Sequence, residues 1–277
     1  MKDLATLRSR LEKERDPGER LRLIEETLRP PEPQLLDTSV LQNLDWVDRK
    51  LEEFEEAEDA EISALGGTHG LDDGGVWDEQ KIILLEQRFG KELARDLLDL
   101  GTLYKEFEYQ GGYPWLVCDA AIKEAGALQT HKGGRLRELV SFISGHQEDW
   151  SIDSYPEIAQ GLLLARGQLR ISPLILRALG VSCRADISAE TGPLSFLRDA
   201  GDREIVTHAL IANIPAILTT DRRTFWAHRV RLEEMGVQVI RPSELLDQYV
   251  PFWEMCEEEF ARRRASIPRS IPGRITD

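Results

Sequence analysis

Two aspartates, Asp37 and Asp221, each stand at the end of a short apolar run in this sequence. Apolar runs of this length, bounded by turn residues, predict buried strands. Because the carboxyl ends of parallel strands meet at one edge of a sheet, we expect the two carboxylates to lie close together. Carboxylates brought together repel one another unless a cation neutralises them. Mg²⁺ and Mn²⁺ prefer oxygen ligands, so the pattern predicts a divalent-metal site that activates water for phosphoryl displacement.

Two further positions are expected near the same edge: either Asp119 or Glu124, just after a third apolar run, and Asp202 at the start of a helix. Glu124 lies in the helix expected after a third apolar run, at 113–118. Asp119 and Glu157 are alternatives to Glu124, because a Glu within a helix usually faces solvent. Asp202 opens a helical segment, where it would either cap the helix or join the site. The two strand-end aspartates have similar structural alternatives, as a helix cap and as a turn residue.

Short apolar runs alternate with helical periodicity through most of the chain. This alternation is typical of an α/β fold, in which helices flank a parallel sheet. Strands are expected at 34–36, 113–118, 216–220 and 237–242. Helices are expected at 120–128, 203–212 and 229–235, with a loop at 182–193.

Acidic residues are concentrated in one part of the chain. The formal net charge is −15, and residues 45–108 hold 19 acidic and 7 basic residues. Since the rest of the chain is nearly neutral, it can still present a local basic groove to a nucleic acid. We divide the chain into an N-terminal helical extension (1–33), an α/β domain (34–247) with an acidic helical insertion (45–112), and a C-terminal helix with a basic tail (248–277).

Five segments resemble, in this order, motifs of the PIN-domain family of metal-dependent nucleases. They are LLDTSVL at 35–41, VCDAAIKEAGAL at 117–128, DREIVTHAL at 202–210, ILTTDRRTF at 217–225 and GVQVIRPSELL at 236–246. The resemblance covers residues 34–44 and 113–247. It does not extend to the acidic insertion, which makes the interval between the first two acids longer than in compact members of the family.

This resemblance implies a PIN-like three-layer fold and a metal-dependent endoribonuclease, in which water cleaves single-stranded RNA and leaves a 5′-phosphate. The residues that it assigns to one or two Mg²⁺ or Mn²⁺ ions are Asp37, Glu124, Asp202 and Asp221. It makes Ser39 and Thr219 hydroxyl neighbours that hold metal-bound waters or carboxylates in place. Arg222 and Arg223 directly follow the last acid, where a guanidinium is expected to meet a phosphate oxygen of the substrate.

Two other functions are compatible with the same residues. The first is a catalytically silent PIN-like module, in which the acidic insertion and the helices bind a protein partner. The second is a phosphatase or a nuclease acting on DNA flaps, because the same carboxylates would serve either reaction. The chain is also compatible with a homo-oligomer.

Several classes of protein are disfavoured by what the sequence lacks. There is no run of 18 apolar residues, so no membrane span is expected, and the charged N-terminus does not resemble a secretory signal. The three cysteines are far apart, which disfavours a disulfide framework and predicts a reducing cytoplasm. The motifs of P-loop, Rossmann, metalloprotease and α/β-hydrolase sites are absent.

Overall fold

The structure is a computed structural model of residues 1–277. The residues that it describes are 4–47, 49–50, 79–110, 113–127, 134–143, 171 and 173–266. Three parts of the sequence interpretation lie outside them: residues 51–78 of the acidic insertion, the alternative ligand Glu157, and the tail from position 267. In the described part of the chain, no helix is both long and apolar enough to cross a membrane.

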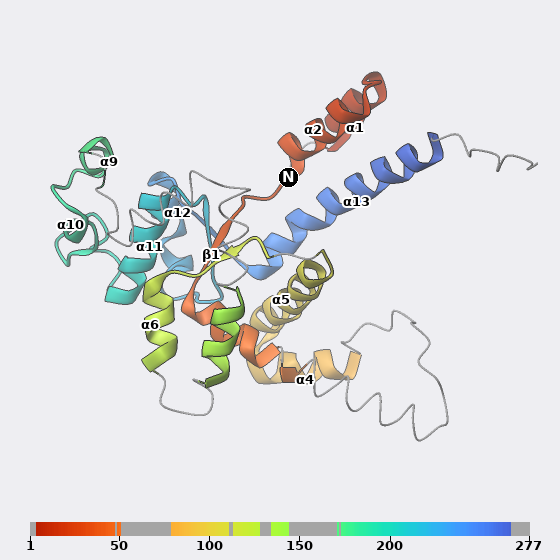
Figure 1. Ribbon diagram of the computed structural model, residues 1–277. Helices are drawn as coiled ribbons and strands as arrows, with labels where there is room; N and C mark the ends of the chain where they lie inside the picture. The colour runs from red at the N-terminus through yellow and green to blue at the C-terminus, as the bar shows by residue number, and fades with distance from the viewer. Residues whose placement is uncertain are drawn as a thin grey trace, which may run out of the picture. The chain divides into compact units, whose positions relative to one another are not determined.

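The chain divides into two compact units, and the larger one, residues 31–244, contains the sheet. All four strands are parallel, in the order β2-β1-β3-β4 (Figure 1). They are β1 (Gln34–Leu36), β2 (Trp115–Leu116), β3 (Ala216–Leu218) and β4 (Gln238–Ile240). The first three are buried along their whole length, as is typical of strands with both faces covered. The predicted α/β fold with a parallel sheet flanked by helices is therefore confirmed.

Helices flank this sheet on the described part of the larger unit. They are α4 (Glu79–Phe89), α5 (Lys91–Gln110), α6 (Asp119–Ala127), α9 (Pro173–Ala178), α10 (Arg184–Ser188), α11 (Ala200–Ala212), η1 (Trp226–His228) and α12 (Arg229–Glu234). Residues 38–47 and 134–143 are also helical. α4 packs against α5, and α6 packs against α11 (Figure 1).

The start of α11 differs from the sequence prediction. The helix begins at Ala200, and its N-cap is Asp199 rather than Asp202. Oδ1 of Asp199 accepts the backbone N–H groups of Gly201 at 2.7 Å and of Asp202 at 3.2 Å. The capping oxygen must come from the residue before the first turn, because only there does the side chain reach the free N–H groups. The side chain of Asp202 is therefore not used as a cap.

The loop predicted at 182–193 is also wrong, because it contains α10. The carboxylate of Asp186 stabilises the start of this helix by accepting the backbone N–H groups of Ser182 and Cys183, both at 3.0 Å. These hydrogen bonds lower the pKa of Asp186. A helix of five residues is too short to show the apolar periodicity on which the sequence prediction depends.

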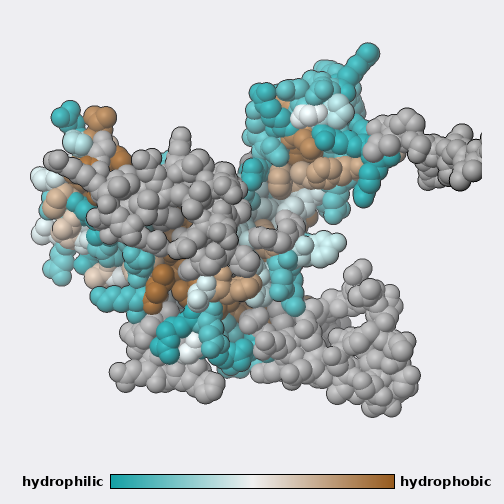
Figure 2. Space-filling view, viewed as in Figure 1, coloured by the Kyte–Doolittle hydropathy of each residue, from teal (hydrophilic) through white to brown (hydrophobic). Residues whose placement is uncertain are grey.

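The smaller unit consists of helices from both ends of the chain: α1 (Leu4–Lys13), α2 (Pro17–Leu28) and α13 (Pro242–Ser266) from Leu245 onward. The N-terminal helices expected from the sequence are thus present. Their shared core holds Leu7, Leu11, Ile24, Leu28 and Met255. In Figure 2 these helices carry hydrophilic residues on their outer surface, with hydrophobic residues between them. Burial of these apolar side chains drives the association of helices that are far apart in sequence.

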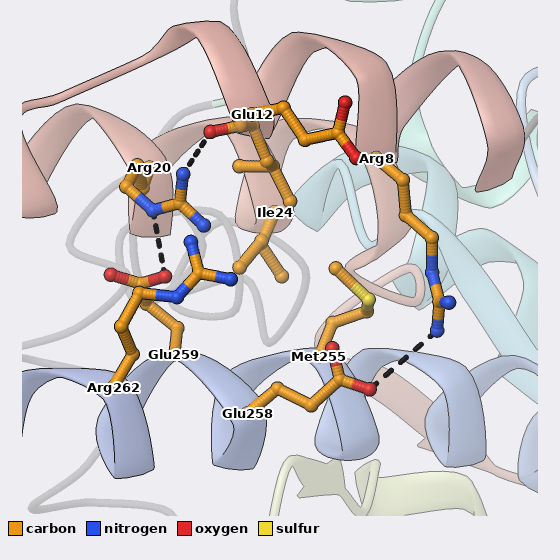
Figure 3. A pocket seen from close by; sticks show the side chains of 9 residues that line it. Arg8, Glu12, Arg20, Ile24, Met255, Glu258, Glu259 and Arg262 are labelled. Atoms are coloured by element: carbon orange, nitrogen blue, oxygen red, sulfur yellow. Dashed lines mark hydrogen bonds and ion pairs between the residues drawn. The ribbon is translucent and has the colours of Figure 1, made fainter. Parts of the chain in front are cut away.

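A buried ion pair lies beside this core. Nε of Arg20 donates to Oε2 of Glu259 at 2.8 Å, and both side chains are less than one-tenth exposed. The same guanidinium donates to the carbonyl oxygen of Leu11. Figure 3 shows these residues around a cavity of about 180 Å³, with Arg8 and Glu258 paired at 3.5 Å beside it. Buried positive and negative charge are therefore matched in this unit.

Candidate functional site

Asp37 lies directly after β1, at the carboxyl edge of the sheet, and is only 4% exposed. Its backbone N–H donates to the carbonyl oxygen of Leu218 on β3, which fixes the residue between two strands. Oδ2 accepts hydrogen bonds from the hydroxyls of Ser39 at 2.5 Å and Thr219 at 2.7 Å. Burial nevertheless raises the pKa of Asp37, and the charge of Asp221 raises it further against the opposing effect of the hydroxyls.

A chain of hydrogen bonds leads to this carboxylate. The amide of Asn43 donates to the hydroxyl of Thr220 at 2.7 Å, and that hydroxyl donates to Ser39 at 3.0 Å. Ser39 in turn donates to Asp37. Because each donor in the chain points toward the carboxylate, the network orients Asp37 and favours its ionised form. Ser39 and Thr219, which the resemblance makes hydroxyl neighbours of the site, are thus direct contacts of Asp37.

Asp221 lies in the loop after β3, where the sequence analysis expects it. Its Oδ1 accepts the backbone N–H of Arg223 at 2.7 Å, and its Oδ2 accepts the hydroxyl of Thr224. The backbone N–H of Asp221 donates to the hydroxyl of Thr219 at 2.9 Å. Thr219 therefore joins Asp221 to Asp37, since the same hydroxyl donates to the carboxylate of Asp37.

Asp202 lies in the first turn of α11, and its pKa is raised to about 7. Burial is the largest cause of this shift, followed by the charges of Asp37, Asp199, Asp221 and Glu124. In the described part of the chain, no hydrogen bond is formed by the carboxylate of Asp202. Asp202 therefore lies within electrostatic range of the other three acids of the candidate site and of Asp199, which the sequence analysis does not include. We call these five residues the carboxylate cluster.

Glu124 reaches the cluster from α6. Its Oε2 accepts a hydrogen bond at 2.6 Å from the hydroxyl of Thr38, the residue that follows Asp37 in the sequence. Its Oε1 lies against Gly201 at the start of α11, in the space that a Cβ at position 201 would occupy. Of the two alternatives to Glu124, Asp119 acts electrostatically on His208, and Glu157 lies outside the described residues. Thr38 and Gly201 are thus functional candidates that periodicity alone does not identify.

The donor atoms of the cluster suit a hard divalent cation, because they are carboxylate and hydroxyl oxygens. Within the described ranges, however, no three His, Cys, Asp or Glu side chains converge closely enough to hold a metal ion between them. Asp37, Asp221 and Glu124 are each held by neighbouring donors, and like charges separate in the absence of a counter-charge. Metal binding would therefore require side chains to rotate inward, and Asp202 is the acid with no hydrogen bond to break.

Arg222 forms an ion pair with a residue outside the carboxylate cluster. Its guanidinium pairs with Glu92 near the start of α5, although the sequence interpretation places it against the substrate. Two of its nitrogens, Nε and Nη2, are buried without a hydrogen-bond partner. Burial and the neighbouring charge of Arg241 lower the pKa of Arg222. A contact of this side chain with phosphate would require the pair with Glu92 to open.

Arg223 is exposed and lines two hollows. The first has a volume of about 340 Å³ and is lined by Phe89, Gly90, Lys91, Glu92, Leu93 and residues 220–223. The second has a volume of about 330 Å³ and is lined by Phe196, Leu197, Arg198, Arg223, Thr224 and His228. Basic and aromatic side chains therefore line both hollows, and Asp221 of the carboxylate cluster lines the first of them.

The chain has been compared with protein-family models, with curated proteins and with solved structures. None of the three comparisons finds a match. A functional assignment must therefore depend on the geometry and chemistry of the chain's own residues.

Proposed function

We propose that this protein is a divalent-metal-dependent endoribonuclease, of the PIN type that its motifs resemble, with single-stranded RNA as substrate. The observation that carries the proposal is that Asp37 and Asp221 lie at the carboxyl edge of the parallel sheet, joined through the hydroxyl of Thr219. Asp202 lies close enough for the charges of both acids to raise its pKa. A cluster of like charges at the carboxyl edge of a parallel sheet is costly for folding. Such a cost is typical of a site that becomes favourable when a cation binds.

The residues assigned to Mg²⁺ or Mn²⁺ are Asp37, Glu124, Asp202 and Asp221. When bound, such a cation supplies an activated water and stabilises charge on the phosphoryl oxygens. Asp37 contributes a carboxylate that Ser39 and Thr219 hold at the edge of the sheet, so the other acids are the ones that rotate toward a bound cation. Asp202 is the acid most affected by repulsion, and its ionised form is the one that a nearby cation favours.

The arrangement also supplies a group for the substrate. Arg223 is exposed, follows Asp221 by two residues and lines both neighbouring hollows. A guanidinium at this place can bind two oxygens of one phosphate. It would compensate the repulsion between the carboxylate cluster and an RNA strand.

The direct test is incubation of the purified chain with 5′-labelled single-stranded RNA in Mn²⁺, in Mg²⁺ and in EDTA. We expect cleavage only with metal, and products that carry a 5′-phosphate at the new end. Thermal unfolding in the same buffers provides a second readout, since a ligand present at 100 times its Kd stabilises the folded state by about 2.7 kcal/mol. Cleavage that persists in EDTA, or no cleavage with either metal, contradicts the proposal.

A catalytically silent module is the second candidate. It is favoured by one observation: the carboxylates of the described chain do not converge on a common metal position. In that function the helices and the acidic insertion bind a protein partner. The melting temperature then does not respond to Mn²⁺, whereas the nuclease predicts an increase. For either function we propose a reducing compartment, the cytoplasm, because all three cysteines are free.

A further inference from the structure

The hollow lined by Phe196, Leu197, Arg198, Arg223, Thr224 and His228 lies directly beside the carboxylate cluster. Thr224, which lines it, donates its hydroxyl to Oδ2 of Asp221. The hollow has a volume of about 330 Å³, which is within the range of small-molecule sites. A ligand group in the hollow is therefore one side chain away from the cluster.

Phe196 presents an aromatic ring in a fixed position. The guanidinium of Arg231 lies 4.0 Å from the centre of the ring, and the imidazole of His228 meets it edge to face at 5.2 Å. Both contacts come from the segment of η1 and α12. Since two side chains hold the ring and its residue also lines the hollow, Phe196 forms a preformed surface on which a nucleobase can stack.

Two guanidinium groups line the same hollow. Arg198 and Arg223 are both exposed, and within the described ranges neither forms an ion pair with a carboxylate. Other exposed arginines of this acidic chain form surface ion pairs with carboxylates. In the described part of the chain Arg198 and Arg223 do not, so a role in neutralising nearby acids does not account for them. Arginine binds phosphate through two parallel hydrogen bonds, so the pair suits a phosphate group.

We propose that this hollow is a nucleotide subsite, in which Phe196 stacks on a base while Arg198 and Arg223 bind the adjoining phosphate. This inference rests on the proposed function, because the nucleotide belongs to the strand whose next phosphodiester reaches the carboxylate cluster. The subsite places a single-stranded nucleic acid across the Asp221 loop. Double-stranded substrate does not fit this mode, because its bases are not free to stack on a side chain.

The test measures binding of a fluorescent single-stranded oligonucleotide of about eight uridines in EDTA, where cleavage does not contribute. We expect Arg198→Gln and Arg223→Gln each to weaken binding about tenfold and to reduce the salt dependence by about one released ion. Phe196→Leu, which removes the ring but keeps much of its volume, is expected to weaken binding about tenfold without changing the salt dependence. Arg177→Gln, an exposed residue on α9, is the charge-matched control and is expected to bind as the wild type does.

Each outcome bears on the subsite separately from the nuclease activity. Wild-type chain that does not bind the oligonucleotide overturns the subsite, and so do Arg198→Gln and Phe196→Leu variants that bind as tightly as the wild type. Arg198 is exposed, so its variant tests the subsite even if Phe196→Leu proves unstable. Binding that is lost as expected, together with no cleavage in Mn²⁺, supports the subsite and removes the proposed nuclease activity. Cleavage of RNA in Mn²⁺, together with variants that bind the oligonucleotide as the wild type does, supports the nuclease activity and overturns the subsite.

Discussion

Two carboxylates of this protein are equally buried and have opposite surroundings. Glu259 in the helical unit is 3% exposed, and Asp37 in the sheet unit is 4% exposed. Glu259 is paired with the guanidinium of Arg20, whereas the nearest groups of Asp37 are hydroxyls and further acids. Because a buried charge is costly unless it is paired, the fold compensates the charge of Glu259 and leaves that of Asp37 without a cationic partner among the described residues.

A third buried carboxylate shows that the sheet unit does not leave all of its buried acids without a cationic partner. Asp96 on α5 is fully buried in the sheet unit, and it pairs with Arg241 at 2.5 Å and accepts the hydroxyl of Ser243 at 2.8 Å. In the sheet unit, the buried carboxylate of Asp96 therefore has a cationic partner, and the contact joins α5 to the segment that follows β4. The carboxylate cluster is the place in the described chain where five acids meet with their charges unmatched.

The largest expected effect is that of Asp37→Asn on RNA cleavage. Removing a metal-binding carboxylate is expected to reduce the rate about 10³- to 10⁴-fold, because the cation loses a fixed ligand. The melting temperature in EDTA should not fall, since the amide oxygen can accept the same two hydroxyls and a buried charge is removed. Single-turnover cleavage and thermal unfolding measure the two effects. Asp119→Asn, an acid outside the cluster, is the matched control, and equal loss of activity in both variants contradicts the assignment.

The next largest effect is that of Arg20→Met on stability. This change removes the closer partner of the buried Glu259 and leaves the partly exposed Arg263, 3.7 Å from its Oε1, so it is expected to cost at most about 3–5 kcal/mol of unfolding free energy. The double variant Arg20→Met/Glu259→Leu should recover most of that loss, because no buried charge is left unpaired. Urea unfolding of both variants measures the difference. If the single variant is as stable as the wild type, the contrast between Glu259 and Asp37 does not hold.

A smaller effect is expected for Gly201→Ala. The new Cβ occupies the position of Oε1 of Glu124 and lies 2.9 Å from Oδ1 of Asp199, the oxygen that caps α11, so both side chains must shift. We expect cleavage to fall about tenfold, since a cluster acid is misplaced. Stability should change by less than about 1 kcal/mol, because the higher helix propensity of alanine is offset by the disturbed cap. Denaturant unfolding and cleavage rates test this, and a large loss of stability would indicate a structural role for Gly201.

The smallest effect is the dependence of stability on pH without metal. The pKa of Asp202 is raised from 3.8 to about 7 in the folded state. Between these pH values the folded state holds a proton that the unfolded state has released, so stability rises as pH falls from 7 toward 4. The melting temperature in EDTA should therefore be about 5 °C higher at pH 5 than at pH 8, with less of this difference in Asp202→Asn. An identical pH dependence in both proteins would mean that Asp202 is not the group responsible.

Several features of the fold follow from the amino-acid sequence by itself, because their signals are local. The apolar runs at 34–36 and 216–218 predict strands, and the order of strands and helices predicts a parallel sheet. From that rule alone, Asp37 and Asp221 are expected at one edge of the sheet. The structure places both there, joined through Thr219.

Only the tertiary structure determines which charged side chains contact one another. Arg20 and Glu259 are 239 positions apart, and no periodicity relates them. The pairing of Arg222 with Glu92 and the contact of Thr38 with Glu124 likewise depend on how distant segments pack. Local patterns specify backbone conformation and which face is apolar, whereas the partner of a charged side chain is set by long-range packing. The sequence therefore predicts four of the five acids of the carboxylate cluster, whereas packing adds Asp199 and decides which other groups lie beside them.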